Sequence, residues 1–460
     1  MSFATSLRLQ YQGQSRDLAI SCGVNPDVQD QVMLVRKRKS RIFFLRKFFD
    51  YPISLSSETL KKLGFARTVA IGLSYLRRAL FPLKEVKNLE EFFINRFGDR
   101  LYRTFFKSYT EKVWGVPCTQ IDAEWGVQRI KKLSVWRSIK HFAGRKLRGK
   151  TDDLSQKDTE TSLIERFLYP KYGPGQMWEE VARKVRDMGG TIVMEQAVQK
   201  LHVLGNRVVS VTTADRLGNS FSYEADFVFS TMPVQNLIRS LDIPVPANVR
   251  EVSDGLMYRD FITVGLLLKN LNVHEETPDG KGLLSDNWIY IQEPDVLAGR
   301  LQIFNNWSPW MISDPRKVWV GVEYFCNEGD SIWAQTDEQL KQLAAKELAR
   351  IGIIEDSAVL DSIVLRVPKA YPAYFGTYAR FDEIREFLDN FENLLLIGRN
   401  GMHKYNNQDH SMLAAMTAVD GIVAGRIDRV NIWNVNTEAE YCEGRADSGE
   451  PVTSGAGARE

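Results

Sequence analysis

The residues best suited to bind a ligand lie together in one stretch near the C-terminal end of the chain. An apolar run over 393–397 ends at Gly398 and Arg399, and a loop over 400–410 follows that is crowded with hydrogen-bonding side chains. A helix is predicted from about Ser411, with small residues on one face. A buried strand that ends in glycine lets a ligand approach its backbone closely. The start of the helix offers free N–H groups and the positive end of its dipole, so the stretch predicts a site for an anion or a carbonyl group.

Single side chains of this stretch also have ordinary explanations. Tyr405, taken alone, is most often a half-buried loop tyrosine, and Arg399, taken alone, is a surface ion pair of little energetic value. The position of Arg399 after a strand-end glycine favours a contact with a cofactor or a phosphate instead. His403 and His410 lie seven residues apart in a loop, without acids in ligand register, so no metal site is predicted.

The elements that position this stretch follow from hydrophobic periodicity and from turn residues. Helices are predicted over about 57–80, 88–109, 125–133, 176–188 and 337–351. Strands are predicted over about 41–44, 191–194, 207–213, 226–230, 261–268, 318–322 and 362–367. Trp178, at the start of one helix, is expected in the core rather than in catalysis. The polar segment 143–160 is predicted as a surface loop, and the tail from 442 as disordered.

The composition is that of a soluble globular protein of 460 residues, with 44% hydrophobic and 26% charged residues. Lysine and arginine total 60 against 58 acids, a balance that argues against a nucleic-acid-binding protein. The basic runs 35–39 and 145–150 are interpreted as solvated faces or loops. Four well-separated cysteines without a CxxC pair fit a reducing compartment. No apolar run approaches the roughly 18 residues of a membrane span, and no signal-peptide core begins the chain, so a cytoplasmic location is expected.

Several motifs resemble a known family of flavoproteins. Gly398, Arg399, Lys404, Tyr405 and Asp409 match the spacing of the C-terminal flavin motif of UDP-galactopyranose mutases. That family is joined to the amine and protoporphyrinogen oxidases in one superfamily. Further matching segments occur in the same order, at 109–117, 169–178, 226–233 and 370–374. The resemblance spans about residues 40–441, and several ordered motifs make it far more specific than a single glycine-rich motif would be.

The resemblance implies an α/β fold, in which a Rossmann-like FAD-binding domain of glutathione-reductase type is interleaved with a substrate domain. The substrate domain is expected to have a helical part and a β-sheet part. The implied boundaries are 1–49 for a remnant of the N-terminal region, 50–142 for the helical part, 164–235 and 385–428 for the FAD-binding parts, 240–370 for the β-sheet part and 442–460 for the tail.

FAD and a small-molecule substrate, with a nucleotide sugar as one class, are also implied by the resemblance. The implied cofactor-binding residues are Gly398, Arg399, Asp409, His410, Ser411, Met412 and Val198. The implied catalytic residues are Tyr405, Asn407, Tyr371 and Tyr374. Tyr371 and Tyr374 could equally pack a strand end, and residues 305–307 could form either a turn or the wall of a pocket.

Two departures from the family pattern bear on function. No strand, Gly-x-Gly-x-x-Gly turn and helix is found: Gly173 to Gly175 has a proline between its glycines, and Gly455 to Gly457 follows no strand. We therefore expect that an N-terminal βαβ unit is missing from this sequence and that the chain as given binds FAD poorly. Mutases also carry aspartate where this chain has Asn407, which cannot carry a negative charge.

Three functions stay open at this point. The first is a mutase-like flavoenzyme that acts on a nucleotide sugar. The second is an oxidoreductase, similar to amine or protoporphyrinogen oxidases, that takes hydride from its substrate. The third is a truncated and inactive remnant.

Overall fold

The structure is a computed structural model of the chain. It describes residues 6–11, 14–19, 24–51, 53, 56–123, 166–274 and 283–435. The predicted helix over 125–133, the predicted loop over 143–160 and the predicted disordered tail lie outside the described residues. Within the described residues, no helix is both long and apolar enough to cross a membrane.

The largest element is a seven-stranded mixed sheet, which we call the sheet lobe together with the helix α12 (Asp337–Arg350). In spatial order its strands are β15 (Val359–Gly376), β11 (Leu256–Leu268), β14 (Val318–Cys326), β13 (Arg300–Ile303), β12 (Trp288–Ile291), β4 (Ser40–Phe44) and β5 (Lys47–Asp50). Neighbours run antiparallel except β12 and β4, which are parallel. The predicted strands at 41–44, 261–268, 318–322 and 362–367 are confirmed, but β11 and β15 are much longer than predicted.

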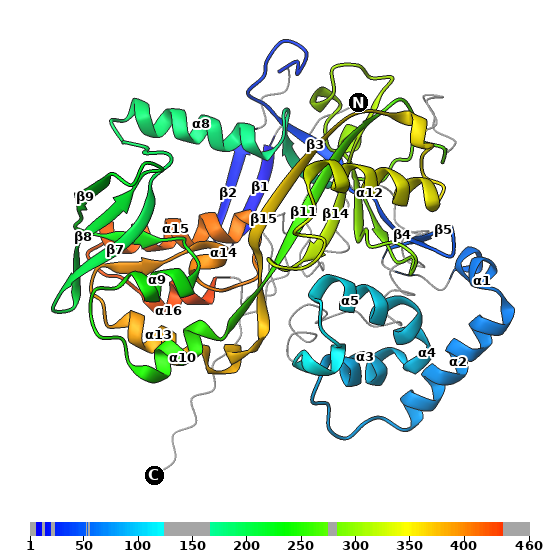
Figure 1. Cartoon of the computed structure of the whole chain (residues 1–460), viewed down its shortest axis with the longest axis horizontal. Helices are drawn as coiled ribbons and strands as arrows, with labels where there is room; N and C mark the ends of the chain where they lie inside the picture. The colour runs from blue at the N-terminus through cyan, green and yellow to red at the C-terminus, as the bar shows by residue number, and fades with distance from the viewer. Residues whose placement is uncertain are drawn as a thin grey trace.

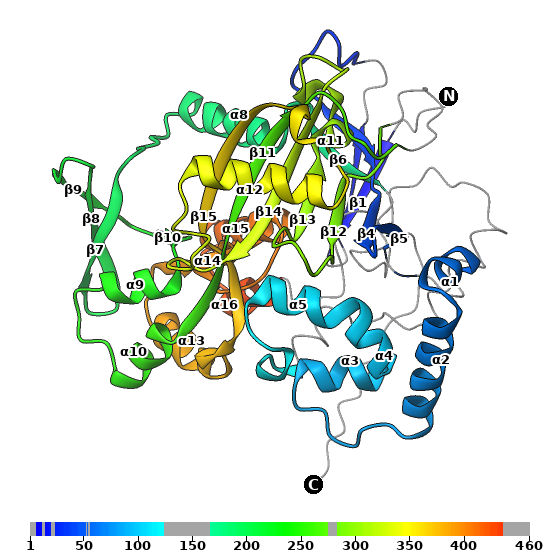
Figure 2. The same cartoon turned by 45° about the vertical axis from the view of Figure 1, so that its right-hand side comes forward.

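The core of the sheet lobe follows from the two-residue period of its strands. Ile262, Val264 and Leu266 alternate along β11 and are fully buried in one cluster with residues of α12. A capping box formed by Thr336 and Gln339 begins α12 as predicted, near residue 337. One face of the sheet is thus closed by a helix, as Figures 1 and 2 show.

A helical part packs near the β4–β5 end of the sheet. Its elements are α1 (Ser57–Leu63), α2 (Phe65–Leu80), α3 (Leu89–Phe97), α4 (Asp99–Leu101), a π-helical turn (Tyr102–Phe106), α5 (Lys107–Trp114) and a 3₁₀ turn (Cys118–Gln120). The predicted single helix over 57–80 is wrong in one respect. Gly64 has φ 84°, and this left-handed conformation, which glycine tolerates, separates α1 from α2.

A second group of elements forms what we call the small lobe, which is seen at the left of Figure 1. Its strands are β7 (Ala197–Leu204), β8 (Arg207–Ala214), β9 (Ser220–Glu224), β10 (Val228–Ser230) and β16 (Leu394–Leu396). Its helices are α9 (Val234–Ser240), α10 (Ala247–Asp254), α13 (Phe381–Asp389), α14 (Gly398–Gly401), α15 (Gln408–Val423) and α16 (Arg429–Asn434). Strands β7, β8 and β9 form an antiparallel sheet, and β10 and β16 form a parallel pair.

Several predicted boundaries need correction in and beside this lobe. The strand predicted over 191–194 is wrong: these residues belong to no strand, and β-structure begins at Ala197, after Glu195 with φ 61°. The strand predicted over 393–399 ends at Leu396, and Gly398 begins the short helix α14. Helix α15 begins three residues earlier than predicted, at Gln408.

The small lobe leaves large apolar side chains exposed among the described residues. Helix α15 buries Ala414 and Ala418 on one side, but Met416 is 58% exposed and Val423 is 83% exposed. Other exposed apolar residues of the same lobe are Phe227, Phe229, Met412 and Val419. Trp178, on α8 (Pro174–Asp187), is 40% exposed, so its predicted place in the core is wrong. Patches of this kind usually mark a surface that something else covers.

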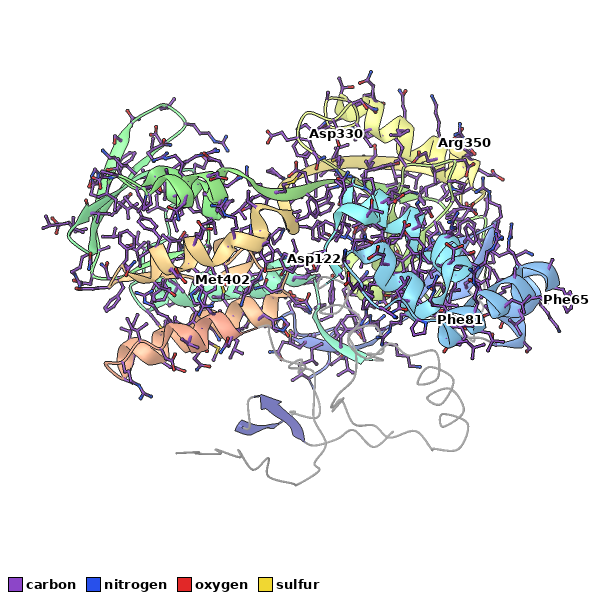
Figure 3. The ribbon with its side chains drawn as sticks, turned by 90° about the horizontal axis from the view of Figure 1, so that it is seen from below. Phe65, Phe81, Asp122, Asp330, Arg350 and Met402 are labelled. Carbon is purple, nitrogen blue, oxygen red and sulfur yellow. The ribbon has the colours of Figure 1, made fainter. Side chains whose placement is uncertain are left out.

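Two strands connect the lobes. Leu268 pairs with Val359 at the sheet-lobe end of β11 and β15, and Leu256 pairs with Gly376 at the other end. Both strands run continuously from one lobe to the other in Figures 1 and 2. Seen from below in Figure 3, Met402 marks the small lobe, while Phe65 marks the start of α2 at the far side of the helical part.

Two shorter strand pairs complete the described elements. Strand β3 (Met33–Lys37) pairs antiparallel with β6 (Arg166–Pro170). Strands β1 (Ser6–Tyr11) and β2 (Gln14–Ala19) form a hairpin.

Candidate functional site

The carboxyl ends of β10 and β16 lie side by side, with Ser230 paired to Leu396. Gly398 follows with φ 77°, and a Cβ atom added to it would find no protein atom closer than 3.9 Å. Gly401, at the other end of α14, has no such space, because its Cβ would collide with the carbonyl oxygen of Ser230. Gly398 is therefore required for its backbone conformation, and a Cβ atom there would only make ordinary contacts with Thr231 and Ser411, whereas Gly401 is required for packing.

Buried polar atoms near this edge have no hydrogen-bond partner among the described residues, notably Ser230 Oγ and Asn400 Oδ1. Buried groups of this kind normally find a partner. In open sheets with parallel strands, ligands bind beyond the carboxyl ends of the strands. The side-chain-free backbone at Gly398 and these two atoms fit a polar cofactor approaching the edge.

Helix α15 begins beside this edge and carries most of the remaining predicted cofactor residues. Asn407 is exposed and precedes the first turn, and its N–H donates to Nδ1 of His410 at 3.3 Å. Burial would raise the pKa of Asp409, but the neighbouring His410 lowers it below its usual value. Ser411 Oγ donates to Asn406 Oδ1 at 3.2 Å. The predicted residues 407–412 thus share one helix start.

Tyr371 and Tyr405, both predicted as catalytic residues, are in contact. Their rings are stacked, with centroids 5.3 Å apart and planes at 15°. The guanidinium of Arg399 lies 5.4 Å from the Tyr371 ring and 5.2 Å from the Tyr405 ring. Arg399 also donates to the carbonyl oxygens of Asn406 and Ala370. Its guanidinium therefore shapes the loop after Gly398 and ties that loop to β15.

Tyr374 and Tyr405 are joined in a different way. The hydroxyl of Tyr374 accepts from the backbone N–H of Tyr405 at 2.7 Å. The Tyr374 ring stacks on Tyr378, with centroids 4.4 Å apart. Tyr374 therefore supports the backbone of Tyr405 and packs the end of β15, which was one of its two predicted interpretations.

A buried ion pair completes the group and was not predicted from the sequence. Arg300 on β13 lies 2.6 Å from the carboxylate of Glu323 on β14, and it donates to the Tyr371 hydroxyl at 2.8 Å. Gln302 donates to the other oxygen of Glu323. Burial alone would lower the pKa of Arg300, but the Glu323 carboxylate raises it well above its usual value. In the sequence, the signal for this ion pair was a single charged residue in each of two otherwise largely apolar strands, Arg300 in β13 and Glu323 in β14.

The helical part contributes aromatic rings to the same place. Tyr109 on α5 lies edge-on to Tyr290 on β12, with centroids 5.5 Å apart. Tyr51 lies 4.6 Å from Tyr290 on another side. Burial raises the pKa of Tyr109 well above its usual value, so its hydroxyl stays protonated. Trp114, at the end of α5, lies 6.2 Å from Tyr405. The sheet lobe, the helical part and the small lobe therefore meet around Arg300, and the group can bind a polar ligand by hydrogen bonds and ring contacts.

The remaining predicted residues lie outside this group. Val198 is an exposed residue of β7, an edge strand of the β7–β8–β9 sheet. His403 is fully buried, with Nε2 at 3.1 Å from the carbonyl oxygen of Ala373. Burial lowers the pKa of His403 to about 4, so the ring is neutral at pH 7.

Residues 305–307, predicted as a turn or a pocket wall, lie in the short helix α11 (Phe304–Trp307). Two surface hollows, of about 640 and 330 Å³, lie elsewhere. The first is lined by residues of α13 and by Asn390, the second by residues from 270–274 and 315–318 and by Leu283, and neither is lined by a predicted site residue.

The fold is the one shared by UDP-galactopyranose mutases and by amine and protoporphyrinogen oxidases, as the predicted resemblance implied. The chain is similar to a reduced UDP-galactopyranose mutase with 19% identity and a TM-score of 0.69, over 89% of this chain and 84% of that one. It is also similar, with 13% identity and a TM-score of 0.54, to a protein of Exiguobacterium sp. 255-15 assigned as a protoporphyrinogen oxidase. That match covers 86% of this chain and 85% of that one.

A putrescine oxidase bound to putrescine is a further similar structure. It matches with 13% identity and a TM-score of 0.50, over 94% of this chain and 91% of the oxidase. No protein-family model matches the chain. At these identities the likeness establishes a common fold.

Proposed function

We propose that this chain is an FAD-dependent flavoenzyme that acts on a nucleotide sugar, in the manner of UDP-galactopyranose mutases. The observation that carries the proposal is the contact between Arg300, Tyr371 and Tyr405, since it joins the sheet lobe to the loop that follows Gly398. A cation, hydroxyl groups and aromatic rings are the groups that recognise a diphosphate and a nucleobase.

Each part of the proposed site has a distinct task. Bound FAD, in its reduced form, would supply the nucleophile for a reaction without net oxidation. Gly398 and the start of α15 would hold it, because the first N–H groups of a helix favour anions and carbonyl oxygens. Arg300 and Tyr371 would orient the phosphates of the substrate, and the Tyr405 hydroxyl would bind one phosphate oxygen. Tyr109 and Tyr290 would contact the base. Asn407, with no negative charge, would not serve as a general base.

An amine-oxidase-like oxidoreductase is the second candidate, and one observation favours it. Glu323 lies 2.6 Å from Arg300 and neutralises much of its charge. A site with a paired arginine attracts a diphosphate less strongly than a free arginine does. Around Arg300, a substrate without phosphate would find a nearly neutral site lined by aromatic rings.

The domain assignment forms part of the same proposal. We assign the FAD-binding part to 164–235 and 385–428, and the substrate part to 50–142 and 240–370. A strand–turn–helix segment is proposed to cover the exposed apolar side of α15 and β10 and to bind the pyrophosphate of FAD. The support is the exposure of Met416, Phe229 and their neighbours, because parallel strands are normally covered on both faces.

Flavin binding is tested by a matched pair of glycine variants. Gly398 and Gly425 both have positive φ, 77° and 68°, and a Cβ atom would clash with the protein at neither position, but Gly425 lies at the opposite end of α15. Valine strains the backbone equally at either position, so only Gly398→Val should exclude the cofactor. In a titration with FAD followed by flavin fluorescence, the wild type and Gly425→Val should bind with the same affinity, which is expected to be low for the chain as given, and Gly398→Val should bind several-fold more weakly. Wild-type affinity for FAD in Gly398→Val would contradict the assignment.

The substrate class is tested separately by Tyr405→Phe. A hydroxyl bonded to a charged phosphate is worth about 1.5–3 kcal/mol, or roughly a ten- to hundredfold change in affinity. Calorimetry with a UDP-sugar should show this loss, while flavin content is unchanged. If the wild type binds FAD but no UDP-sugar, the oxidase function replaces the mutase-like one.

A further inference from the structure

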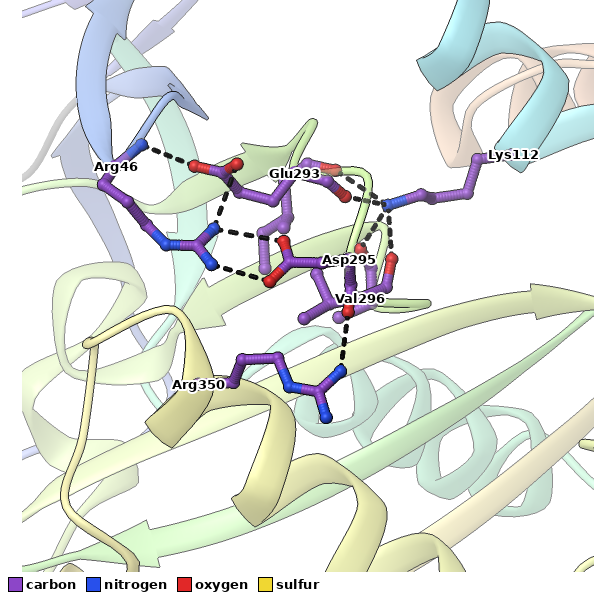
Figure 4. Close-up of polar contacts among 8 residues, drawn as sticks. Arg46, Lys112, Glu293, Asp295, Val296 and Arg350 are labelled. Atoms are coloured by element: carbon purple, nitrogen blue, oxygen red, sulfur yellow. Dashed lines mark hydrogen bonds and ion pairs between the residues drawn. The ribbon is translucent and has the colours of Figure 1, made fainter.

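The turn that joins β12 to β13 is built around one side chain of the helical part. The ammonium of Lys112, on α5, lies within hydrogen-bond distance of four backbone carbonyl oxygens (Figure 4). These oxygens are those of Ile291 at 3.3 Å, Glu293 at 3.2 Å, Val296 at 3.0 Å and Ala298 at 3.1 Å. An ammonium has three donors and no acceptor, so all of them are satisfied here by main-chain oxygens alone.

Backbone N–H groups of the same turn, unlike its carbonyl groups, meet an acidic side chain. The N–H groups of Leu297 and Ala298 donate to the carboxylate of Glu347 at 2.6 and 2.9 Å. The carboxylate of Glu293 accepts from the backbone N–H of Arg46 at 2.5 Å, as Figure 4 shows. The N–H groups of Leu297 and Ala298 thus meet a carboxylate, whereas the carbonyl groups of Val296 and Ala298 meet Lys112. Carbonyl oxygens that are removed from water need a hydrogen-bond donor, and the ammonium of Lys112 is the donor here.

The charges around this ammonium do not pair with it directly. Burial lowers the pKa of Lys112 to about 8, while the carboxylates of Glu347, Glu293 and Asp295 act in the opposite direction. Asp295 is itself paired with Arg46 at 2.7 Å, and its carbonyl oxygen accepts from Arg350 at 3.0 Å. At neutral pH, Lys112 is therefore a cation held by the turn rather than by a salt bridge.

The position of Lys112 connects this turn to the candidate site. Tyr109 lies three residues earlier on the same helix, and residues at this spacing share one helix face. Its ring contacts Tyr290, which lies on β12 directly before the turn, and Arg300 begins β13 directly after it. The turn and its cation therefore link the aromatic ring of the helical part to the arginine of the sheet lobe.

We propose that Lys112 is a positioning residue for the substrate site: it fastens α5 to the β12–β13 turn and so fixes Tyr109 relative to Arg300. The role at the substrate rests on the proposed function, whereas the fastening of the turn does not. Four inward carbonyl oxygens resemble the coordination shell that proteins offer to a monovalent cation. Removal of the side chain should therefore leave a place that a small cation can fill.

A second buried cation keeps α5 in place when Lys112 is changed. Arg259 on β11 donates to the carbonyl oxygens of Val113 at 2.8 Å and of Phe325 at 3.1 Å. It therefore docks the C-terminal end of α5 on the sheet, independently of the turn. A Lys112 variant is expected to fold and to lose only the local connection.

The experiment compares Lys112→Ala with Lys112→Met, which fills the same space without a charge. Hydrogen exchange of the amides over 291–299 should quicken roughly ten- to a hundredfold in both variants, given the strength of charged hydrogen bonds. Ammonium chloride should restore slow exchange in Lys112→Ala and not in Lys112→Met, whereas tetramethylammonium chloride at equal ionic strength, whose cation is too large for the place, should restore it in neither. Exchange at the wild-type rate in Lys112→Ala, or equal rates in the two salts, would overturn the proposal.

The role at the substrate has its own readout. In FAD-reconstituted Lys112→Ala, the affinity for a UDP-sugar should fall by roughly tenfold and recover in ammonium chloride. Recovery of binding by ammonium is not expected of a residue that only stabilises the fold. If exchange responds to ammonium but binding by Lys112→Ala equals that of the wild type, positioning is refuted. If the wild type binds no UDP-sugar, the proposed function fails, and the exchange experiment still decides whether Lys112 fastens the turn.

Discussion

The sheet lobe and the small lobe follow the same plan, a sheet with helices packed on it, but their outer surfaces differ. In the sheet lobe, α12 covers the central strands, and Leu266 is fully buried between them. In the small lobe, α15 buries alanines on one side and exposes Met416 and Val423 on the other. The sheet lobe exposes apolar residues too, such as Leu365, but on its edge strand β15. A helix that is apolar on two sides is suited to burial on two sides. The small lobe therefore has a packed core and, in addition, an apolar helix side that its described residues leave exposed.

The largest expected effect comes from a matched pair of truncations, one in each lobe. Leu266→Ala should lower the free energy of unfolding by about 2–5 kcal/mol, because it leaves a cavity in a packed core. Met416→Ala should change it by less than about 0.5 kcal/mol, because the side chain is mostly exposed. Urea unfolding of both variants measures the contrast. A large loss for Met416→Ala would show that the apolar side of α15 is covered in solution.

An intermediate effect is expected from the pH dependence of the small lobe. His403 titrates near 6.5 when unfolded but only near pH 4 when folded, because burial disfavours its charge. Between these pH values the unfolded chain binds more protons, so stability is present above pH 6.5 and is lost as the pH falls towards 4. The lowering of the His403 pKa on folding corresponds to a loss of about 3 kcal/mol in the free energy of unfolding on acidification.

The measurement is urea unfolding of the wild type and of His403→Gln across this pH range. Glutamine does not titrate and can still donate to the carbonyl oxygen of Ala373, so His403→Gln should lose stability less steeply on acidification. Parallel pH profiles for the two proteins would show that another group causes the acid sensitivity. The sheet lobe, without a comparable buried histidine among its described residues, should not contribute to this difference.

The smallest effect is expected at an exposed ion pair of the small lobe. Arg380 lies 2.9 Å from Glu251 and 2.7 Å from Glu383, at the surface. Exposed pairs of this kind contribute little and are screened by salt. Glu251→Gln should therefore shift the unfolding midpoint slightly at low salt and not at all at about 1 M salt, where screening acts within about 3 Å. A shift that persists at high salt would show that the pair is buried by something that covers the lobe.

The sequence allowed the strand, loop and helix around Gly398 to be predicted, because glycine, polar residues and small helical residues each have strong local preferences. It also allowed Tyr371 and Tyr405 to be grouped through family motifs, and the structure stacks them. Arg300 and Glu323 could not be paired in advance, because their contact depends on the register of two antiparallel strands. The separation of α1 from α2 was missed for another reason: Gly64 is tolerated within a helix pattern, and tertiary packing decides whether it breaks the helix.

The two strands shared by the lobes have a mechanical consequence. Since β11 and β15 are hydrogen-bonded to each other from one lobe to the other, no single loop can act as a hinge between them. The ladder has register irregularities on both sides of Tyr258 and again between Leu267 and Leu268, and Lys369 has a positive φ of 50°. Any rotation of one lobe against the other must therefore twist the ribbon about its long axis. Tyr371 lies on this ribbon and pairs with Arg259 beside one of these irregularities. Torsion between the lobes would therefore displace Tyr371, the residue that joins Arg300 to Tyr405.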